Sequence, residues 1–387
     1  MVALASTPNE AASLRATKPQ KISHGWHEGY LVRFRTPVGG ARLAFLRIWH
    51  SQLSYWRLDR PISRALELRA MEIARTVGIP TPEPLVVGKQ QQPLAGECEK
   101  DYGGAAKARL DFLCYRFVAH ARNHRELPSW LQGKASEQAE TLLMLRLMVQ
   151  LHSCDLAEVD TEPIARFDCP SEHLAYLSDL ASKTGQPRLT TAAARVSALF
   201  KGNSAPPPLP SALLHYDWHL GNVMLDKQGE VAALIDWEFA GIADPRLDLA
   251  RFCRRTRWSH AGPGRLRDKG AERSLLRPEG KRNEHMMWEH YARLRFGKET
   301  DALTYLGAVE PWLAMECLQV LVMAFSAAIA TAAAQRRQGE AGRGTPASKT
   351  EGNVEGPLPM LRCDLIEWVE DAYEAEAHLV RLGVLDA

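Results

Sequence analysis

The seven cysteines form no C-x-x-C pair, and their odd number leaves no complete set of disulfides. These absences argue against a disulfide-rich secreted scaffold and against a zinc-binding module. No run approaches about 18 uninterrupted apolar residues, the minimum for a membrane-spanning helix. The net charge is only +2, so the overall field favours neither nucleic acid nor a membrane surface as a partner. We therefore expect a cytoplasmic protein with reduced thiols.

Two sequence signals are also missing. Residues 1–20 contain no apolar core of the kind that a secretory signal needs. Their Ala- and Ser-rich composition leaves a transit peptide open, although two basic residues are few for one. We predict that they form a disordered tail. No Gly-Lys-Ser/Thr follows the early glycines, which excludes a Walker-type phosphate loop.

The stretch HYDWHLGNVMLDKQGEVAALIDWEF carries the strongest chemical signal in what is present. Asp217 and Asn222 lie in a glycine-containing loop, and two short apolar runs joined by a DKQG turn lead to Asp236. We predict a hairpin that brings the three side chains together. Oxygen ligands of this kind suit Mg²⁺, and a carboxylate beside a hydroxyl suits phosphoryl transfer. The alternative is that these are turn residues bonding their own backbone.

The motifs HYDWHLGNVMLD and IDWEFAGIADPRLDLARF resemble those of the aminoglycoside phosphotransferase and choline kinase-like family of small-molecule kinases. The resemblance implies that Asp217 is the catalytic aspartate and that Asn222 and Asp236 bind the metal. It also implies that His215 braces the loop and that Asp248 ties the following helix to it. Two departures, Tyr216 and Trp218, stand where relatives usually have Gly and Leu, which puts the shape of the acceptor pocket in doubt.

The resemblance also implies a two-lobed, protein kinase-like α+β fold. We expect a small N-terminal lobe with a β-sheet and one helix at residues 21–118, where alternating apolar residues predict strands. A larger, mainly helical lobe carrying the catalytic hairpin would occupy residues 119–387. A Leu- and Met-rich stripe at residues 137–156 predicts a core helix, and His152 at its end is interpreted as a structural cap.

Nucleotide-binding residues are assigned by the same resemblance. Gly25 and Gly29 lie in a loop that would cover the phosphates, although a hairpin with incidental glycines fits equally well. Arg47 occupies the position of the lysine that pairs the α and β phosphates, and Glu67 occupies that of the helix glutamate that holds this cation. The alternative is an ordinary surface salt bridge. The hinge that bonds adenine through its backbone would include Tyr115 and the following residues Arg116, Phe117 and Val118, which are also interpretable as a plain core strand.

Four other features have competing interpretations. A basic segment at residues 252–283 is interpreted as a solvated insertion rather than a nucleic-acid patch, and residues 336–357 as a flexible linker. An acidic helix face would bind a polycationic acceptor or simply be hydrated; its members are Glu367, Glu370, Asp371 and Glu374. Three tryptophans would either cup a quaternary amine or pack in the core; they are Trp218, Trp288 and Trp312.

We therefore predict transfer of the γ-phosphate of ATP, or of GTP, to a hydroxyl of a small-molecule acceptor, with Mg²⁺ as cofactor. Antibiotics, choline, amino acids and sugars all fit as acceptors. One alternative is a catalytically silent pseudokinase, suggested by arginine at position 47. Another is an interaction protein that binds nucleic acid through the basic segment. A protein kinase is disfavoured because no Ala-Pro-Glu segment follows Phe239.

Overall fold

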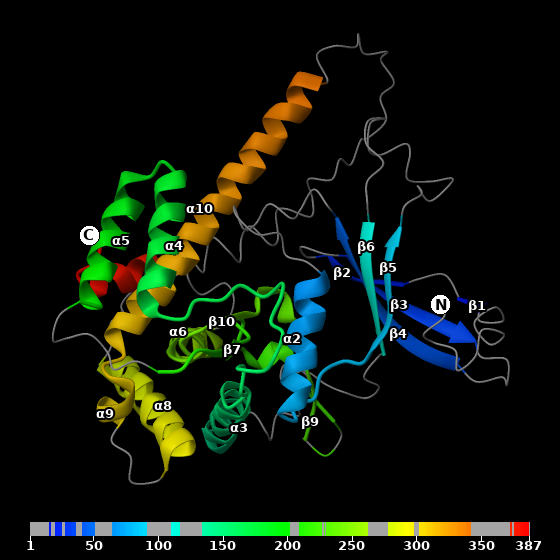
Figure 1. Ribbon diagram of the computed structural model, residues 1–387, viewed down its shortest axis with the longest axis horizontal. Helices are drawn as coiled ribbons and strands as arrows, with labels where there is room; N and C mark the ends of the chain where they lie inside the picture. The colour runs from blue at the N-terminus through cyan, green and yellow to red at the C-terminus, as the bar shows by residue number, and fades with distance from the viewer. Residues whose placement is uncertain are drawn as a thin grey trace. The chain divides into compact units, whose positions relative to one another are not determined.

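The computed structural model describes residues 15–16, 20–24, 28–35, 41–50, 64–90, 110–116, 134–201, 209–226, 228, 230–261, 278–297, 302–341, 372–373 and 375–386. Within these ranges the chain folds into two compact units. The smaller unit contains an antiparallel sheet. The larger unit contains most of the helices and two small hairpin-like sheets (Figure 1).

The sheet of the smaller unit has six strands in the order β1-β3-β4-β6-β5, and β2 also pairs with β3. The strands are β1 (Arg15–Ala16), β2 (Gln20–His24), β3 (Glu28–Arg35), β4 (Ala41–His50), β5 (Pro84–Gln90) and β6 (Leu110–Arg116). Alternate residues point to the same face, so Val32, Ala44, Leu85 and Cys114 form its buried core. The strands predicted from the alternating pattern are confirmed.

Two boundaries of the smaller unit differ from the prediction. Arg15 and Ala16 pair with Arg35 and Phe34, so the end of the predicted tail adds a short strand to the sheet edge. That edge offers free backbone hydrogen-bonding groups, which a polar segment can satisfy as well as an apolar one. β5 also continues to Gln90, into the segment interpreted as a polar insertion.

Helix α2 (Arg64–Thr76) follows the predicted periodicity, because Leu66, Ala70 and Ile73 recur on one buried face. Gly78 has φ +77 and ends the helix, as its position before Pro80 predicts. Although we expected α2 in the N-terminal lobe, residues 65–81 belong to the larger unit. There the amide of Gln150 donates to the Val77 carbonyl at 2.7 Å.

The larger unit is mainly helical. Its helices are α3 (Lys134–His152), α4 (Pro170–Lys183), α5 (Pro187–Leu199), α6 (Arg246–Ala261), α8 (Pro278–Phe296), α9 (Ala302–Leu306) and the first part of α10 (Glu310–Ala341). Figure 1 shows α4 beside α5 and α3 beside α8. Met144, Leu145, Met148 and Leu151 of α3 are fully buried, which confirms the predicted core stripe.

Two short antiparallel pairs hold the polar motif. Strand β7 (Ala212–Leu214) pairs with β10 (Gly241–Ala243), and β8 (Val223–Leu225) pairs with β9 (Val231–Leu234). The second pair is the predicted hairpin, with the turn around Asp226, whose side chain accepts hydrogen bonds from the backbone of Gln228 and Glu230. The short 3-10 helices η6 (Leu220–Asn222) and η7 (Trp237–Phe239) flank this hairpin.

Helices replace parts of the two segments predicted as irregular. The predicted basic insertion begins inside α6 and ends inside α8, and α10 runs to Ala341, past the predicted start of the linker. Long alanine-rich or charged runs satisfy helix propensity even without a regular apolar stripe. The five cysteines in the described ranges are all free, as expected. No helix of the described chain has the length and apolarity needed to cross a bilayer.

Candidate active site

The loop of residues 215–222 connects β7 to β8 and is buried along most of its length. The residues His215, Asp217 and Asn222 are 0%, 6% and 5% exposed. Buried polar groups require hydrogen-bond partners, because an unpaired one costs about 1–3 kcal/mol. The contacts of this loop therefore show how its polar residues are held.

His215 joins the loop to the end of the hairpin. Its Nδ1 accepts a hydrogen bond from the backbone N–H of Asp217 at 3.2 Å, and its Nε2 donates to the Ile235 carbonyl at 2.9 Å. This pattern requires the neutral ring with its proton on Nε2. Burial lowers the pKa of His215 from its ordinary value, which keeps the ring neutral. The placement fits the bracing role expected for this histidine.

Asp248, in the first turn of α6, is the acceptor that fixes the loop backbone. Its carboxylate accepts hydrogen bonds from the N–H of His215 at 2.9 Å and from that of Tyr216 at 2.8 Å. The indole of Trp218 also donates to it, at 2.5 Å, and His152 Nε2 lies 3.2 Å away. The expected tie between the helix and the loop is therefore made by a fully buried carboxylate.

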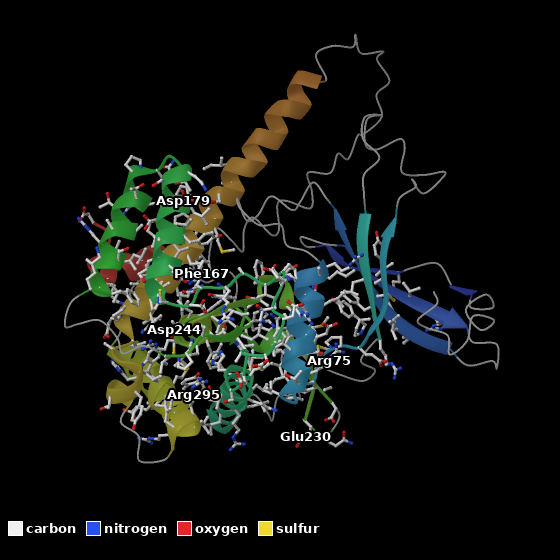
Figure 2. All side chains as sticks on the ribbon, viewed as in Figure 1. Arg75, Phe167, Asp179, Glu230, Asp244 and Arg295 are labelled. Atoms are coloured by element: carbon white, nitrogen blue, oxygen red, sulfur yellow. The ribbon has the colours of Figure 1, made fainter. Side chains whose placement is uncertain are left out.

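His152 does more than end α3. Its Nδ1 lies 2.7 Å from the hydroxyl of Tyr291 on α8, while its Nε2 faces Asp248. Burial lowers the pKa of His152, and burial also raises the pKa of Tyr291. The hydroxyl of Tyr291 additionally accepts from Arg295, which Figure 2 labels. His152 thus links three helices of the larger unit, which corrects its interpretation as a simple cap.

The two departures from the family motif have structural explanations. Tyr216 has φ +59, a left-handed conformation that glycine adopts readily and that is uncommon for a tyrosine. Its ring fills space left by Gly241, where an added Cβ would lie 2.6 Å from Tyr216 Cε2. Trp218 is fully buried and donates to Asp248. Both departures therefore point into the protein core rather than toward an acceptor.

Asp217 is held from two sides. The amide nitrogen of Asn222 donates to its Oδ2 and to its backbone carbonyl, both at 2.9 Å. Arg251 of α6 donates from Nη2 to Oδ1 at 3.1 Å. The half-exposed His219 approaches Oδ2 at 3.3 Å. These contacts present a carboxylate of fixed orientation at the loop.

Asn222 and Asp236 lie at the same end of the hairpin. The register pairs Val223 with Leu234, and the N–H of Ile235 donates to the Asn222 carbonyl at 2.9 Å. Asp236 follows directly with φ +71, a conformation that turns the chain away from the strand. The predicted hairpin geometry of these residues is therefore present.

The residues at this end of the hairpin fit a magnesium ion. Because both hydrogen bonds of the Asn222 side-chain amide are made by its nitrogen Nδ2, its side-chain oxygen Oδ1 is left for a ligand. The half-buried carboxylate of Asp236 supplies a second hard oxygen donor. Within the described ranges, no cluster of three or more His, Cys, Asp or Glu residues is arranged to hold a metal ion.

The predicted nucleotide-binding residues are divided between the two units. Gly29 on β3 faces Arg47 on β4 across the sheet, and both are buried. Glu67 on α2 is buried in the larger unit, so its pairing with Arg47 stays a prediction. Gly25, Phe117 and Val118 lie outside the described residues.

The hinge role of Arg116 stays a prediction. Its N–H donates to the Glu83 carbonyl at 2.8 Å, and its exposed guanidinium pairs with the Glu83 carboxylate at 2.9 Å. The Arg116 N–H is therefore already used at the end of β6 and is not one of the donors that a hinge would offer to a base. A pattern of side chains cannot reveal this, since the groups concerned are in the backbone.

Burial decides between the two interpretations of the tryptophans and corrects the interpretation of part of the basic segment. Trp288 and Trp312, like Trp218, are at most 1% exposed, so the three pack in the core and form no amine cage. Arg254 is fully buried, although it lies in the segment interpreted as solvated. Arg254 can be buried because its guanidinium forms an ion pair at 2.6 Å with the carboxylate of Glu316 on α10. The acidic face from Glu367 to Glu374 lies outside the described residues.

Sequence reasoning missed the acidic and basic residues that surround Asp217. Arg251 and Arg254 on α6 face Glu316 on α10, and all three are buried. A signal was present, since Glu316 is a single acid within the apolar run WLAMECLQVLVM. An acid in such a setting requires a buried cation, because an isolated buried charge is very costly.

The fold and the site together define a protein kinase-like phosphotransferase. A sequence model described as the phosphotransferase enzyme family, APH, matches residues 20–295. The chain therefore belongs to this family. No curated protein matches the chain.

The chain is similar to several solved structures at low identity. LicA in complex with AMP is 14% identical, with a TM-score of 0.50, and covers 96% of this chain and 94% of that chain; LicA is a choline kinase from Streptococcus pneumoniae. Macrolide 2'-phosphotransferase MphH from Brachybacterium faecium is 16% identical (TM-score 0.48, 87% and 94% covered). Aminoglycoside phosphotransferase APH(4)-Ia, in a ternary complex with ADP and hygromycin B, is 15% identical (TM-score 0.48, 86% and 96% covered).

Proposed function

We propose that this protein transfers the γ-phosphate of ATP, or of GTP, to a hydroxyl group of a small-molecule acceptor. Membership of the phosphotransferase family supports a kinase of small molecules. The observation that carries the proposal is the convergence of Asp217 and Asn222, joined at 2.9 Å, with Asp236 at the end of the adjoining hairpin. Phosphoryl transfer depends mainly on such positioning and on neutralisation of charge.

Asp217 orients the acceptor hydroxyl and accepts its proton. Its carboxylate is held in one orientation by Asn222 and His219 at Oδ2 and by Arg251 at Oδ1. When an attacking group is already held in the right geometry, its translational and rotational entropy is lost on binding and no longer adds to the barrier of the reaction. His215 maintains the loop in this conformation through its neutral ring.

Asn222 and Asp236 bind Mg²⁺ through one amide oxygen and one carboxylate. When bound, the ion neutralises charge on the nucleotide phosphates. Arg47 takes the place of the usual lysine and grips nucleotide phosphates. The permanent charge and planar fork of arginine suit phosphate oxygens, although its shape differs from that of lysine.

Substitution of Asp217 by Asn tests the proposal. Purified wild-type protein and the D217N variant are incubated with Mg·ATP and a panel of acceptors that includes hygromycin B, a macrolide and choline. ADP release reports turnover, and a fluorescent ATP analogue reports nucleotide binding. We expect turnover to fall by about 10²–10⁴-fold in D217N, the usual contribution of a general base, while nucleotide affinity stays within about twofold.

The outcomes separate the candidate functions. Nucleotide binding by the wild type without any ADP release would favour the pseudokinase. Wild-type turnover in D217N would exclude Asp217 as the base.

A further inference from the structure

Arg251 occupies an unusual position in the larger unit. It lies on α6, one turn after Asp248, and is 7% exposed. Its two terminal nitrogens contact different acids: Nη2 donates to Asp217 Oδ1 at 3.1 Å, and Nη1 lies 3.4 Å from Glu316 Oε1. A single guanidinium therefore joins α10 to the loop that carries Asp217.

The orientation of the Asp217 carboxylate depends on this contact. The terminal torsion of an aspartate is broad, so one contact fixes only one of its oxygens. Asn222, from the same loop, fixes Oδ2, and Arg251, from outside the loop, fixes Oδ1. With both oxygens held, the plane of the carboxylate is set relative to α6.

A purely structural role explains Arg251 less well. Glu316 is already paired with Arg254, which donates to Oε2 at 2.6 Å and to Oε1 at 3.1 Å. The contact from Arg251 to Glu316 is longer than either, and its Nε donates to none of the described residues. Because a buried donor without a partner costs stability, neutralisation of Glu316 does not account for Arg251.

We propose that Arg251 is a positioning residue that holds the Asp217 carboxylate in the orientation needed to receive the acceptor hydroxyl. The inference rests on the proposed function. Arg251 reaches the loop from α6, and Arg254 on the same helix contacts Glu316 but not Asp217 among the contacts of the described residues. His219 and Asn222, which also face Asp217, belong to the loop itself and move with it.

Arg251→Gln and Arg254→Gln form a matched pair for the test. Both variants remove one buried cation from the same helix and one partner from Glu316, but only R251Q removes a contact to Asp217. ADP release from Mg·ATP is measured with water and with the acceptor that accelerates it most, and folding is checked by circular dichroism. In R251Q we expect kcat to fall by about 10–100-fold, as misplacement of a reacting group does, with KM for ATP within about twofold. In R254Q kcat stays within about twofold.

Equal kcat values in the folded R251Q and R254Q variants would overturn the proposal. The effect would then come from the loss of a buried partner of Glu316, which the two variants share. If either glutamine variant does not fold, R251K and R254K decide the question. Lysine keeps the charge but cannot reach both acids with a fork, so R251K should show a lower kcat than R254K. Equal kcat values in R251K and R254K would also overturn the proposal. Failure of the proposed function looks different, since wild-type protein itself would then release no ADP.

Discussion

Asp248 accepts hydrogen bonds from two backbone amides and an indole, and it lies beside His152, all within the buried part of the larger unit. Asp248→Ala should therefore lower the free energy of unfolding by about 3–5 kcal/mol, because buried donors lose their charged acceptor. Asp179→Ala is the control, since Asp179 (labelled in Figure 2) forms an exposed pair with Lys183 on α4 and should matter by less than about 1 kcal/mol. Urea unfolding measures both losses of stability. Equal losses in the two variants would contradict the role of Asp248.

The sequence predicted the chemical roles of the residues in the polar motif, but it did not predict which residues they contact. The spacing of Asp217, Asn222 and Asp236 in an alternating pattern predicted a hairpin, and the hairpin is present. The contacts of Asp217 with Arg251 involve residues 34 positions apart in the chain, and those of Arg251 with Glu316 involve residues 65 apart. Sequence spacing holds no information about such pairs until helix packing is known.

Burial of His152 makes stability depend on pH. Because burial lowers its pKa from the ordinary value of 6.5, the unfolded chain binds a proton below that pH and the folded chain does not. Stability is thus complete above 6.5 and decreases as the pH falls below it, by up to about 1.4 kcal/mol per pH unit for one such histidine. Thermal unfolding at pH 7 and pH 5 measures this loss.

His152→Gln should reduce the pH slope of stability, because glutamine has no group that titrates in this range. A second buried histidine, His215, also has a lowered pKa, so part of the slope should remain. An unchanged slope in H152Q would show that other groups account for it.

At the scale of elements, β10 and the 215–222 loop fit together through one glycine. A Cβ at position 241 would lie 2.6 Å from the buried ring of Tyr216. Gly241→Ala should therefore cost about 1–3 kcal/mol of stability through overpacking. In a Tyr216→Ala background the ring is absent, so the same change should cost much less. Additive losses in the double variant, measured by chemical unfolding, would contradict this coupling.

The elements themselves followed largely from local pattern. Period-two alternation predicted the sheet, and the 3.6-residue repeat predicted α2 and α3. The extent of α6 and α10 was underestimated because their charged or alanine-rich ends resemble loops in composition. Part of α6 is held by Glu316, a partner that a local sequence window around α6 does not contain.

At the scale of the whole molecule, nucleotide binding should stabilise the protein even without transfer. A ligand at 100 times its Kd adds about 2.7 kcal/mol to the stability of the folded state. Mg·ATP should therefore raise the melting temperature of the wild type and of D217N. Arg47→Ala should lose most of this rise, whereas Arg33→Ala, which changes an exposed arginine of the same sheet, should keep it. Differential scanning fluorimetry provides the measurement, and an undiminished rise in R47A would remove Arg47 from the nucleotide site.

The composition of the whole chain predicted a globular protein with little net electrostatic field, and membership of the phosphotransferase family agrees with a globular protein. The division into units was less predictable. α2 was expected with the sheet because it follows β4 in the chain, yet its buried face belongs to the larger unit. Order along the chain and membership of a compact unit are separate properties, and only the first is written in the sequence directly.

The backbone amides that Asp248 anchors belong to residues 32 and 33 positions earlier in the chain. A chimaera that receives only the eight-residue loop from this protein would thus have the sequence of the loop but not its conformation. Grafting the chemistry elsewhere requires the start of α6 as well, with its aspartate and the arginine one turn further on. In this protein the smallest transferable unit of the site is discontinuous.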